Sequence, residues 1–335
     1  MLQAVLLEPR KIIFREVEMP VIDSKHVLLK VKRVGICGSD IDAYRGEHPY
    51  TKLPVIQGHE VSAEVVDVGK EVKGFEPGDR VVIRPQIVCN RCSSCLRGDY
   101  HICKNLKVIG FQSQGCASEF VSLSPENLMK ISKDVSFDIA TLCEPLAVAV
   151  HALKKTDGGK NAVVLGAGTI GNLVAQCAKE KGMEVAITDI SEYRLKIARD
   201  CGIENVINAR RQEVCKEIEH IFGEADVIFE CVGIEDTINQ AILCSRPGGK
   251  IVVVGVYPKT VNVNIGLVQN WELKIEGTLM YKKEDFEESI KLIEKKRLIV
   301  DRLITNRFKF RDYNKAYRFI EESGEKHMKV IVEVG

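Results

Sequence analysis

The stretch NAVVLGAGTIG, residues 161–171, decides the fold of this chain. Its first five residues form a short apolar run typical of a buried strand, and Thr169 begins a run with helical spacing of apolar residues. Between them, Gly166, Gly168 and Gly171 make the pattern G-x-G-x-x-G, in the strand-to-helix context that a dinucleotide-binding turn requires. We expect Gly166 to allow the tight turn, Gly168 to let a pyrophosphate approach the backbone, and Gly171 to let the helix pack against the strand.

The residues around this turn point to the cofactor. The start of the helix, at Thr169 and Ile170, would direct partial positive charge toward the phosphates. Asp189 ends the next expected strand, where a carboxylate accepts hydrogen bonds from ribose hydroxyls and repels the extra phosphate of NADP. Residues 190–192 bring no cation, so the sequence predicts NAD, with Arg194 as a further cofactor contact. The alternative is a glycine turn in another kind of α/β protein, with Asp189 as a helix cap.

Strands and helices alternate on both sides of this turn. We expect strands at 161–165, 184–188, 205–207, 226–231, 250–256 and 274–279, and helices at 169–181, 192–200, 211–221 and 238–244. This alternation predicts βαβ units and a parallel sheet. The C-terminal part should form two helices and a strand, at 286–295, 313–322 and 329–334.

The N-terminal part has a different pattern. Short apolar runs broken by charges occupy 1–18, 26–34, 61–68 and 80–83, and turn signals such as Pro77-Gly78-Asp79 separate them. Several short strands at close spacing predict a compact, barrel-like β domain. The length of 335 residues is compatible with two domains of roughly 150 residues each.

Composition excludes several classes of protein. Hydrophobic residues make up 45% and charged residues 28%, as in ordinary globular proteins. Lys+Arg is 48 and Asp+Glu is 47, so a general attraction to nucleic acid or anionic lipid is not expected. No apolar run approaches the roughly 20 residues that span a bilayer. Arg10 and Lys11 follow the first apolar stretch, the reverse of a signal peptide. We therefore expect a cytoplasmic protein with no nucleic-acid or membrane partner.

Twelve cysteines indicate metal binding or catalysis rather than disulfides in such a chain. The spacing C-x₂-C-x₂-C-x₇-C of Cys89, Cys92, Cys95 and Cys103 can place four thiolates around one structural zinc ion. The loop has no apolar pattern of its own, so the metal would contribute to its folding. The alternative ligand for these cysteines is an iron–sulfur cluster, but in ferredoxins three residues separate the third and fourth cysteines, whereas seven separate Cys95 and Cys103 here. A zinc ribbon that binds nucleic acid is a second alternative, and the balanced numbers of basic and acidic residues in the chain argue against it.

Most of the scattered cysteines lie in expected helices and strands. We expect these to be small buried hydrophobic residues, namely Cys177, Cys201, Cys215, Cys231 and Cys244.

Three further segments carry polar side chains suited to an open zinc site. Cys37 follows an expected strand, His59 and Glu60 precede another, and Glu144 precedes the nucleotide-binding segment. Taken alone, a single cysteine or histidine is more often a structural residue than a metal ligand. Together they offer a thiolate, an imidazole and two carboxylates, which is the donor set of a catalytic zinc.

These motifs together resemble the zinc-dependent medium-chain dehydrogenases, and within them the sorbitol (polyol) dehydrogenase branch. The resemblance covers essentially the whole chain, with G-H-E at 58–60, P-G-D-R-V at 77–81, the four-cysteine lobe, E-P-L-A-V followed by His151, and the glycine turn. It implies an α/β protein in which a GroES-like β domain joins a doubly wound Rossmann domain, with the active site between them. The expected ranges are a GroES-like catalytic domain at 1–146 with a zinc lobe at 86–105, completed by 280–335, and a Rossmann NAD-binding domain at 147–279.

The resemblance also implies roles for the candidate residues. Cys37 and His59 should bind the catalytic zinc, while either Glu60 or Glu144 ligates it and the other holds the zinc-bound water. Ser39 matches a hydroxyl that begins the proton relay. Two zinc ions per chain are expected, one catalytic and one structural. The zinc would act as a Lewis acid on the substrate hydroxyl, and NAD would accept the hydride. The family further implies a homodimer or homotetramer, built partly through the Rossmann sheet edge.

Three positions depart from the family pattern. Ala63 replaces a usual glycine. Asp42 stands where members often have a relay histidine, so Asp42, His48 or bulk water would carry the proton. Met280 replaces the arginine that contacts the polyol in sorbitol dehydrogenases, which predicts a less polar pocket wall. A smaller diol, a secondary alcohol or a less polar cyclic polyol then competes with sorbitol as substrate.

The sequence thus predicts hydride transfer from a secondary hydroxyl of a polyol or related alcohol to NAD, giving a ketone. Dehydrogenases of 2,3-butanediol, threonine or sugar acids share the same framework. A zinc-free quinone or enoyl reductase is a further alternative, and a non-catalytic redox-sensing binding protein is another. The retained Cys37, His59 and Glu144 argue against both.

Overall fold

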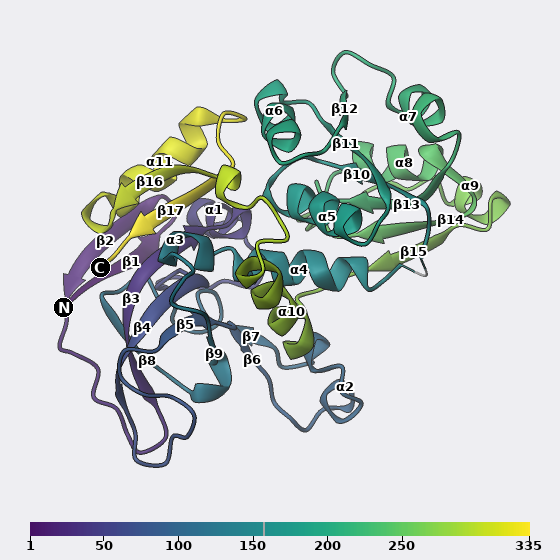
Figure 1. Ribbon diagram of the computed structural model, residues 1–335. Helices are drawn as coiled ribbons and strands as arrows, with labels where there is room; N and C mark the ends of the chain where they lie inside the picture. The colour runs from purple at the N-terminus through teal and green to yellow at the C-terminus, as the bar shows by residue number, and fades with distance from the viewer. Residues whose placement is uncertain (157) are drawn as a thin grey trace.

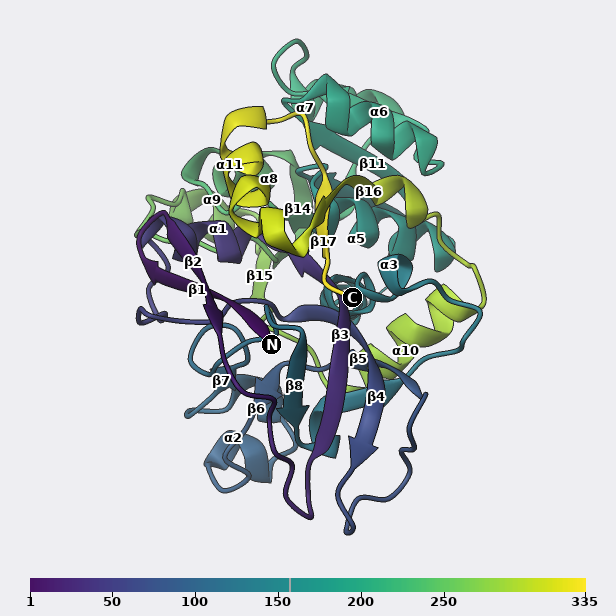
Figure 2. The same cartoon turned by 90° about the vertical axis from the view of Figure 1, so that its left-hand side faces the viewer.

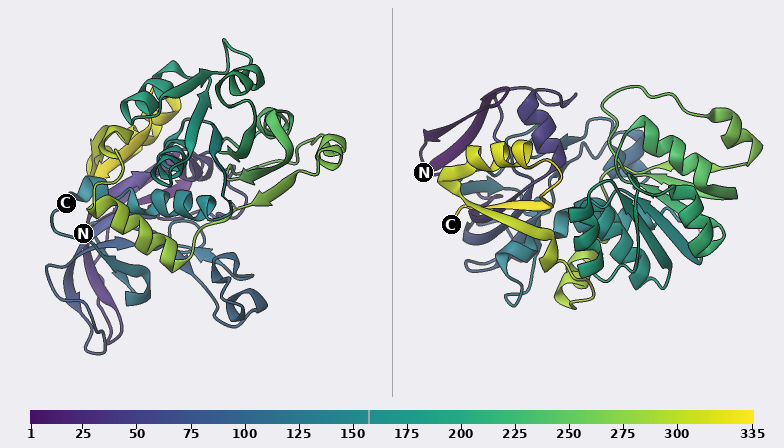
Figure 3. Two further views of the ribbon diagram at one scale, coloured as in Figure 1. Left: turned by 45° about the vertical axis from the view of Figure 1, so that its right-hand side comes forward. Right: turned by 90° about the horizontal axis from the view of Figure 1, so that it is seen from above.

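The computed structural model describes residues 1–156 and 158–335 and contains two bodies side by side (Figures 1 and 3). One is built on a six-stranded parallel sheet and the other on a seven-stranded sheet. Both chain termini lie on the second body (Figure 1). Within the described ranges, no helix is long and apolar enough to cross a membrane.

The six-stranded sheet has the order β12-β11-β10-β13-β14-β15 and is parallel throughout. Its strands are β10 (Asn161–Leu165), β11 (Glu184–Asp189), β12 (Asn205–Asn208), β13 (Ala225–Glu230), β14 (Ser245–Val253) and β15 (Lys274–Gly277). The chain begins in the centre at β10, runs outward to β12, and returns to the other side at β13. This is the doubly wound Rossmann order, and ligands bind at its reversal point, outside the carboxyl ends of β10 and β13. The predicted parallel sheet is confirmed.

Helices cover both faces of this sheet. They are α5 (Thr169–Glu180), α6 (Glu192–Asp200), α7 (Val214–Phe222), α8 (Glu235–Cys244) and α9 (Ile265–Asn270). Leu173 and Val174 of α5 pack on one face, in a core that also includes Leu195 of α6. Ile218 of α7 and Ile242 of α8 pack on the other. The apolar spacing that predicted these helices therefore marks their buried sides.

The seven-stranded sheet has the order β16-β17-β3-β4-β5-β9, and β8 also pairs with β3. Its strands are β3 (Val27–Ile36), β4 (Glu60–Val68), β5 (Arg80–Ile83), β8 (Phe120–Leu123), β9 (Leu128–Lys130), β16 (Ile304–Lys309) and β17 (Lys329–Glu333), with a hairpin of β1 (Leu2–Glu8) and β2 (Lys11–Glu16) beside them. β17 pairs antiparallel with β3, so the C-terminal strand lies next to an N-terminal one (Figure 2). The expected return of the tail to the β domain is confirmed.

The remaining elements include the zinc lobe and two helices at the junction. They are α1 (Gly38–Arg45), β6 (Gln86–Ile87), α2 (Ser93–Leu96), η1 (Tyr100–Ile102), β7 (Lys107–Val108), η2 (Pro125–Asn127), α3 (Phe137–Ala140), α4 (Cys143–Leu153), α10 (Lys283–Glu294), η3 (Asp301–Leu303), η4 (Phe310–Asp312) and α11 (Tyr313–Ser323). α4 and α10 lie between the two sheets (Figure 1), and one hydrophobic core joins Leu146 of α4 and Phe286 of α10 to both. We propose the division into 1–146 with 280–335, and 147–279.

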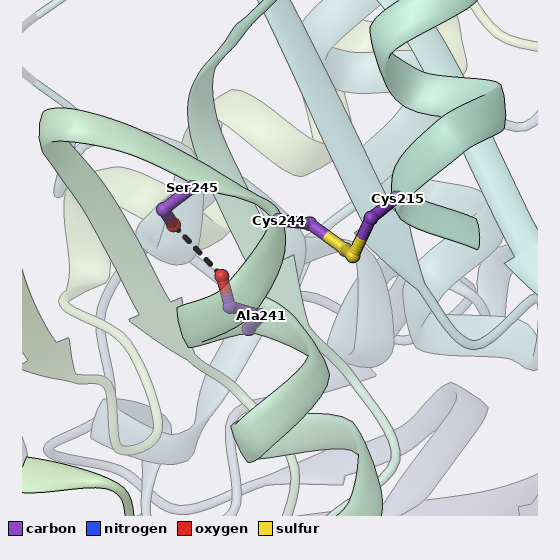
Figure 4. The surroundings of a disulfide bond; sticks show 4 residues. All are labelled: Cys215, Ala241, Cys244 and Ser245. Atoms are coloured by element: carbon purple, nitrogen blue, oxygen red, sulfur yellow. Dashed lines mark hydrogen bonds between the residues drawn. A yellow bond between two sulfur atoms is a disulfide. The ribbon is translucent and has the colours of Figure 1, made fainter. Parts of the chain in front are cut away.

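The sequence-based expectation for Cys215 and Cys244 is wrong. They form a disulfide that joins α7 to α8, next to the hydrogen bond from Ser245 Oγ to Ala241 O (Figure 4). Spacing could not reveal this pair, because the two residues are 29 positions apart on different helices. Cys177 and Cys201 are buried free thiols as expected, whereas Cys231 is half-buried.

The disulfide should stabilise this body. Replacing Cys215 with Ser is expected to lower the free energy of unfolding by about 3 kcal/mol, because a 29-residue loop is no longer closed in the unfolded chain. Urea unfolding of the wild type and C215S, each with and without a reductant, would measure this. Reduction should destabilise only the wild type, and an identical midpoint for all four samples would contradict the prediction.

Candidate active site

The seven-stranded sheet brings three of the predicted zinc ligands together. Cys37 directly follows β3, while His59 and Glu60 stand at the start of β4. The two strands are antiparallel and Gly35 lies opposite Glu60, so the end of one meets the beginning of the other. The ligand atoms of Cys37, His59 and Glu60 all lie within 4.8 Å of one another. This donor set fits a zinc ion.

Neighbouring residues shape this cluster. A Cβ atom at Gly35 would lie 2.2 Å from Glu60 Oε2, so only glycine leaves room for the carboxylate. The fully buried Asp40 accepts a hydrogen bond from the Cys37 backbone N–H at 2.9 Å, and its other oxygen lies 3.6 Å from His59 Nδ1. Burial opposes a charge on His59, but the Asp40 carboxylate outweighs it and raises the pKa of His59 well above its usual value. Among the described residues, Nδ1 has no hydrogen-bond partner, and a metal ion bound at this buried imidazole nitrogen would satisfy it.

Glu60 is also part of a buried ion pair. Lys329, on β17, places Nζ 2.6 and 2.7 Å from the two carboxylate oxygens and donates a third hydrogen bond to Ile36 O at 3.2 Å. Both side chains are almost fully buried, at 4% and 1% exposure. The C-terminal strand therefore supplies the charge that balances Glu60.

Glu144 lies outside the three-residue cluster but close to it. It stands in the first turn of α4, where Pro145 is tolerated because that position needs no helical N–H partner. The hydroxyl of the buried Tyr281 donates to Glu144 Oε1 at 2.8 Å, and Gln86 Nε2 donates to the Tyr281 carbonyl at 2.7 Å. Burial raises the pKa of Glu144 to about 7, against the opposing charge of His59. Glu144 is thus a held carboxyl group at the edge of the cluster.

The four lobe cysteines meet around one point. Four of their sulfur–sulfur distances are 3.4, 3.5, 3.9 and 4.0 Å. Zn–S bonds of about 2.3 Å in a tetrahedron require separations of roughly 3.8 Å, so the sulfurs fit a single zinc ion. Backbone N–H groups, that of Arg91 first, lower the pKa of the Cys89 thiol to about 6, whereas burial and the neighbouring thiols raise the pKa of Cys95 to about 12. Cys103 is buried, and the other three sulfur-bearing side chains are partly exposed.

Replacing Cys95 with Ser should damage this lobe before it damages the chemistry. The variant is expected to lose one zinc ion per chain and to show a lower melting temperature, because metal binding contributes to the folding of the lobe. Metal analysis and calorimetry of wild type and C95S would test this. Wild-type zinc content in the variant would show that the four lobe cysteines do not hold a structural zinc ion.

The glycine turn has the conformation that its sequence predicts. Gly166 has φ of +97°, and a Cβ atom at Gly171 would lie 1.8 Å from Gly166 O. Apart from its own chain neighbours, no atom of the described residues lies within 4 Å of a Cβ built on Gly168, so space for a ligand is open there. Asp189 accepts a hydrogen bond from Ala167 N at 2.7 Å and from Ser191 N at 2.8 Å. The carboxylate is therefore fixed against the turn.

One cleft joins the two candidate sites. Its lining includes Cys37 and Glu60 from the metal cluster, and Gly168, Thr169, Ile170, Gly171 and Arg194 from the dinucleotide turn and α6. The Nε atom of Arg194 is buried and has no partner among the described residues. Ser39 lies half-buried on the first turn of α1. The structure therefore places some of the predicted metal residues and some of the predicted cofactor residues around one cleft.

Two of the departures from the family pattern, Asp42 and Met280, lie in segments next to residues of the candidate site. The His48 ring stacks on Phe111 at 4.7 Å, and Phe111 lies 5.0 Å from the His59 ring. Burial raises the pKa of Asp42 and lowers that of His48. Met280 has φ of +50°, a left-handed conformation that is rare for such a side chain, immediately before Tyr281.

Sequence reasoning missed the supporting residues Asp40, Tyr281 and Lys329. Lys329 had a signal, because a lysine that opens the apolar strand K-V-I-V must be buried or paired. Asp40 and Tyr281 had none, since a carboxylate in a first helical turn and a tyrosine after a strand are common.

Both parts of the chain match known protein families. A family model described as the alcohol dehydrogenase GroES-like domain matches residues 23–133, and one described as zinc-binding dehydrogenase matches residues 169–295. A sorbitol dehydrogenase of Halalkalibacterium halodurans is 36% identical over 311 residues, 90% of each chain. An L-threonine 3-dehydrogenase of Vibrio cholerae is 34% identical over 312 residues, again 90% of each chain.

Solved structures agree with these relatives. A zinc-binding dehydrogenase from Sinorhizobium meliloti, solved with NADP, superimposes with a TM-score of 0.92 at 27% identity, covering 99% of each chain. The GroES-like family model covers the N-terminal part, which holds the cysteine cluster. The zinc-binding dehydrogenase model covers most of the part that forms the parallel sheet. The chain therefore belongs to the zinc-dependent medium-chain alcohol dehydrogenase family, in its polyol dehydrogenase-like branch.

Proposed function

We propose that this protein oxidises a secondary hydroxyl of a polyol or related alcohol to a ketone, with NAD as hydride acceptor. The observation that carries the proposal is the cleft whose lining includes both Cys37 and Glu60 of the metal cluster and residues 168–171 of the glycine turn. A substrate hydroxyl beside the metal cluster would then face a dinucleotide bound at the turn. This is the arrangement that direct hydride transfer needs.

The residues divide into holding and positioning roles. Cys37, His59 and Glu60 would hold the catalytic zinc, and the four lobe cysteines the structural one. The catalytic zinc, when bound, supplies Lewis-acid stabilisation of charge on the substrate oxygen. Glu60 is the better third ligand, because it lies inside the cluster and Glu144 does not. Glu144, held by the Tyr281 hydroxyl, remains available to accept a hydrogen bond from the water or hydroxyl next to the ion.

We propose Ser39 as the first proton acceptor from the substrate hydroxyl, because it follows the ligand Cys37 by two residues on α1. Asp42 and His48 lie further along the same segment and are the candidate next acceptors. We also propose a homodimer or homotetramer, as the family resemblance implies.

NAD rather than NADP is proposed from Asp189. Its carboxylate is fixed by the turn that would bind the pyrophosphate, so a 2′-phosphate would meet a negative charge that cannot move away. Arg194 lines the same cleft and would contact the cofactor. The Sinorhizobium meliloti neighbour contains NADP, so the choice rests on this carboxylate alone.

Replacing Asp189 with Gly and Ile190 with Arg should shift the preference toward NADP. The first change removes the repulsion, and the side chain at 190 is 46% exposed, so an arginine there can reach a phosphate. We expect the ratio of kcat/KM for NAD to that for NADP to fall by roughly tenfold or more, about 1.4 kcal/mol. Ile190→Arg alone is the control. A wild type that already prefers NADP would contradict the Asp189 argument.

The substrate class is proposed from the pocket wall and the relatives. The sorbitol dehydrogenase relative supports a polyol, whereas Met280 removes a charged contact and favours a less polar substrate. A panel of polyols, 2,3-butanediol, threonine, hexonic acids and simple secondary alcohols, with formation of NADH as readout, tests the proposal. The highest kcat/KM on a polyol supports it. A preference for butanediol, threonine or a sugar acid would keep the chemistry and replace the substrate class.

A further inference from the structure

A fully buried carboxylate lies at the carboxyl end of β13. Glu230 Oε1 accepts hydrogen bonds from the backbone N–H groups of Val232 and Gly233, each at 2.8 Å, and from the Thr237 hydroxyl at 2.7 Å. Its Oε2 accepts one from the Tyr257 hydroxyl at 2.8 Å. Among the described residues no ion pair to Glu230 occurs, so these hydrogen bonds compensate the burial of its carboxyl group.

These donors come from two different loops and, for Thr237, from the first turn of α8. Val232 and Gly233 follow β13, whereas Tyr257 lies beyond β14. A Cβ atom at Gly233, whose φ is +85°, would lie 2.3 Å from Val256 O, and one at Gly255 would lie 2.7 Å from Glu230 Oε2. The loops at 231–234 and 254–257 are therefore packed together around the carboxylate, with glycines where they touch.

The pair of loops stands where the cofactor cleft is formed. β13 borders β10, with Glu230 opposite Leu165, and Cys231 N donates to Leu165 O at 2.9 Å. A Cβ atom at Gly166 would lie 2.6 Å from a methyl carbon of Val232, so the first loop touches the glycine turn. Cys231 also lines the cleft. This is the reversal point of the sheet, where doubly wound folds bind ligands.

Apolar side chains on these loops remain exposed. Val232, Ile234 and Val256 are 42%, 47% and 67% accessible. Three such side chains around a fixed carboxylate form an apolar wall next to the turn, which a flat ring of a bound dinucleotide would cover.

We propose that Glu230 is a positioning residue for the cofactor, clamping the loops 231–234 and 254–257 into one wall of the dinucleotide cleft. This inference rests on the proposed dinucleotide-dependent function. Among the described residues, the Tyr257 hydroxyl is the hydrogen bond that joins the carboxylate itself to the second loop. Tyr257→Phe therefore removes this side-chain tie beyond β14, while the bonds from Val254 N and Gly255 N to Glu230 O keep the start of the loop in place.

The chain offers a matched control on the same strand. Asp226, at the opposite end of β13, also ties separate segments together, since it accepts from Lys160 N at 2.7 Å and from Arg246 Nε at 2.9 Å. It lies at the amino end of β13 and is not part of the cleft lining. Asp226→Ala should therefore lower the melting temperature without changing the affinity for the cofactor.

NADH fluorescence titration of the zinc-loaded protein tests the clamp. Tyr257→Phe should weaken NADH binding and raise KM for NAD by roughly fivefold to tenfold, with a smaller change in kcat, because one hydrogen bond to a charged group is lost. Glu230→Gln should bind within about twofold of wild type, since the amide oxygen can still accept from the first loop and the amide nitrogen can donate to Tyr257.

The outcomes separate the two proposals. Wild-type affinity in Tyr257→Phe, or an equal loss of affinity in Asp226→Ala, would overturn the clamp and leave the proposed function in place. A wild type that binds neither NADH nor NADPH would overturn the proposed function, and the clamp with it.

Discussion

Replacing Cys37 with Ser is expected to abolish turnover while leaving the fold intact. Cys37 stands at the junction of β3 and α1, half-buried in the cleft, and supplies the one thiolate of its cluster. Loss of this ligand removes the Lewis acid, which is worth several kcal/mol of stabilisation in the transition state. We therefore expect kcat/KM to fall by roughly a thousandfold or more, because each 1.36 kcal/mol is a factor of ten.

Zinc content and kinetics measured on the same samples test this result. C37S should contain one zinc ion fewer per chain than the wild type and should keep the wild-type melting temperature within a few degrees. Cys201→Ser is the matched control, because that buried thiol donates to Ile299 O at 3.3 Å, as a serine hydroxyl also can. Full activity in the C37S variant would show that turnover does not depend on a zinc ion held by Cys37.

The second large effect is expected at Lys329. Lys329→Met leaves the carboxylate of Glu60 buried without its counter-charge, and breaking such a pair costs roughly 3–5 kcal/mol. The loss should be greatest in zinc-depleted protein, since a bound cation would itself balance Glu60. Urea unfolding of the variant with and without zinc measures the difference.

The double variant Lys329→Met with Glu60→Gln separates charge from packing. Removing both charges should recover much of the lost stability, because no uncompensated carboxylate remains. Activity should stay low, since Glu60 is also the proposed third ligand. Equal destabilisation in the single and double variants would show that Lys329 acts through packing and that the ion pair is unimportant.

Local patterns in the sequence predicted most of the fold. The strand, glycine turn and helix at 161–181 agree with β10 and α5 because each residue there serves one local requirement, a buried strand, a tight turn or an apolar helix face. The helix α6 begins and ends where its pattern predicts, at Glu192 and Asp200. The clustering of the lobe cysteines was predictable because their spacing is short.

Features that depend on long-range contacts were not predictable in this way. α4 was not expected as a helix, because its apolar residues are buried on nearly all sides and show no clear periodicity. The contact of Lys329 with Glu60 joins residues 269 positions apart, and it depends on β17 pairing with β3. The Cys215–Cys244 disulfide likewise depends on how α7 and α8 pack on the sheet.

The residues of the candidate site also differ in whether a local sequence pattern or a long-range contact identifies them. Cys37, His59 and Glu60 were found because short motifs carry them, and the sheet register then placed them together. The proposal of Glu60 rather than Glu144 as the third ligand rests on the geometry, since both carboxylates stand in equally clear motifs. Glu230 drew no attention in the sequence, because only the fold shows that its four donors come from two loops and from α8.

The measurement that tests the central claim most directly is the zinc dependence of NADH formation by the purified protein with a polyol substrate. The account predicts two zinc ions per chain, one for each ligand cluster. It also predicts loss of turnover when a chelator removes the catalytic ion and recovery when zinc is restored. Full turnover in protein that contains no metal would contradict the account.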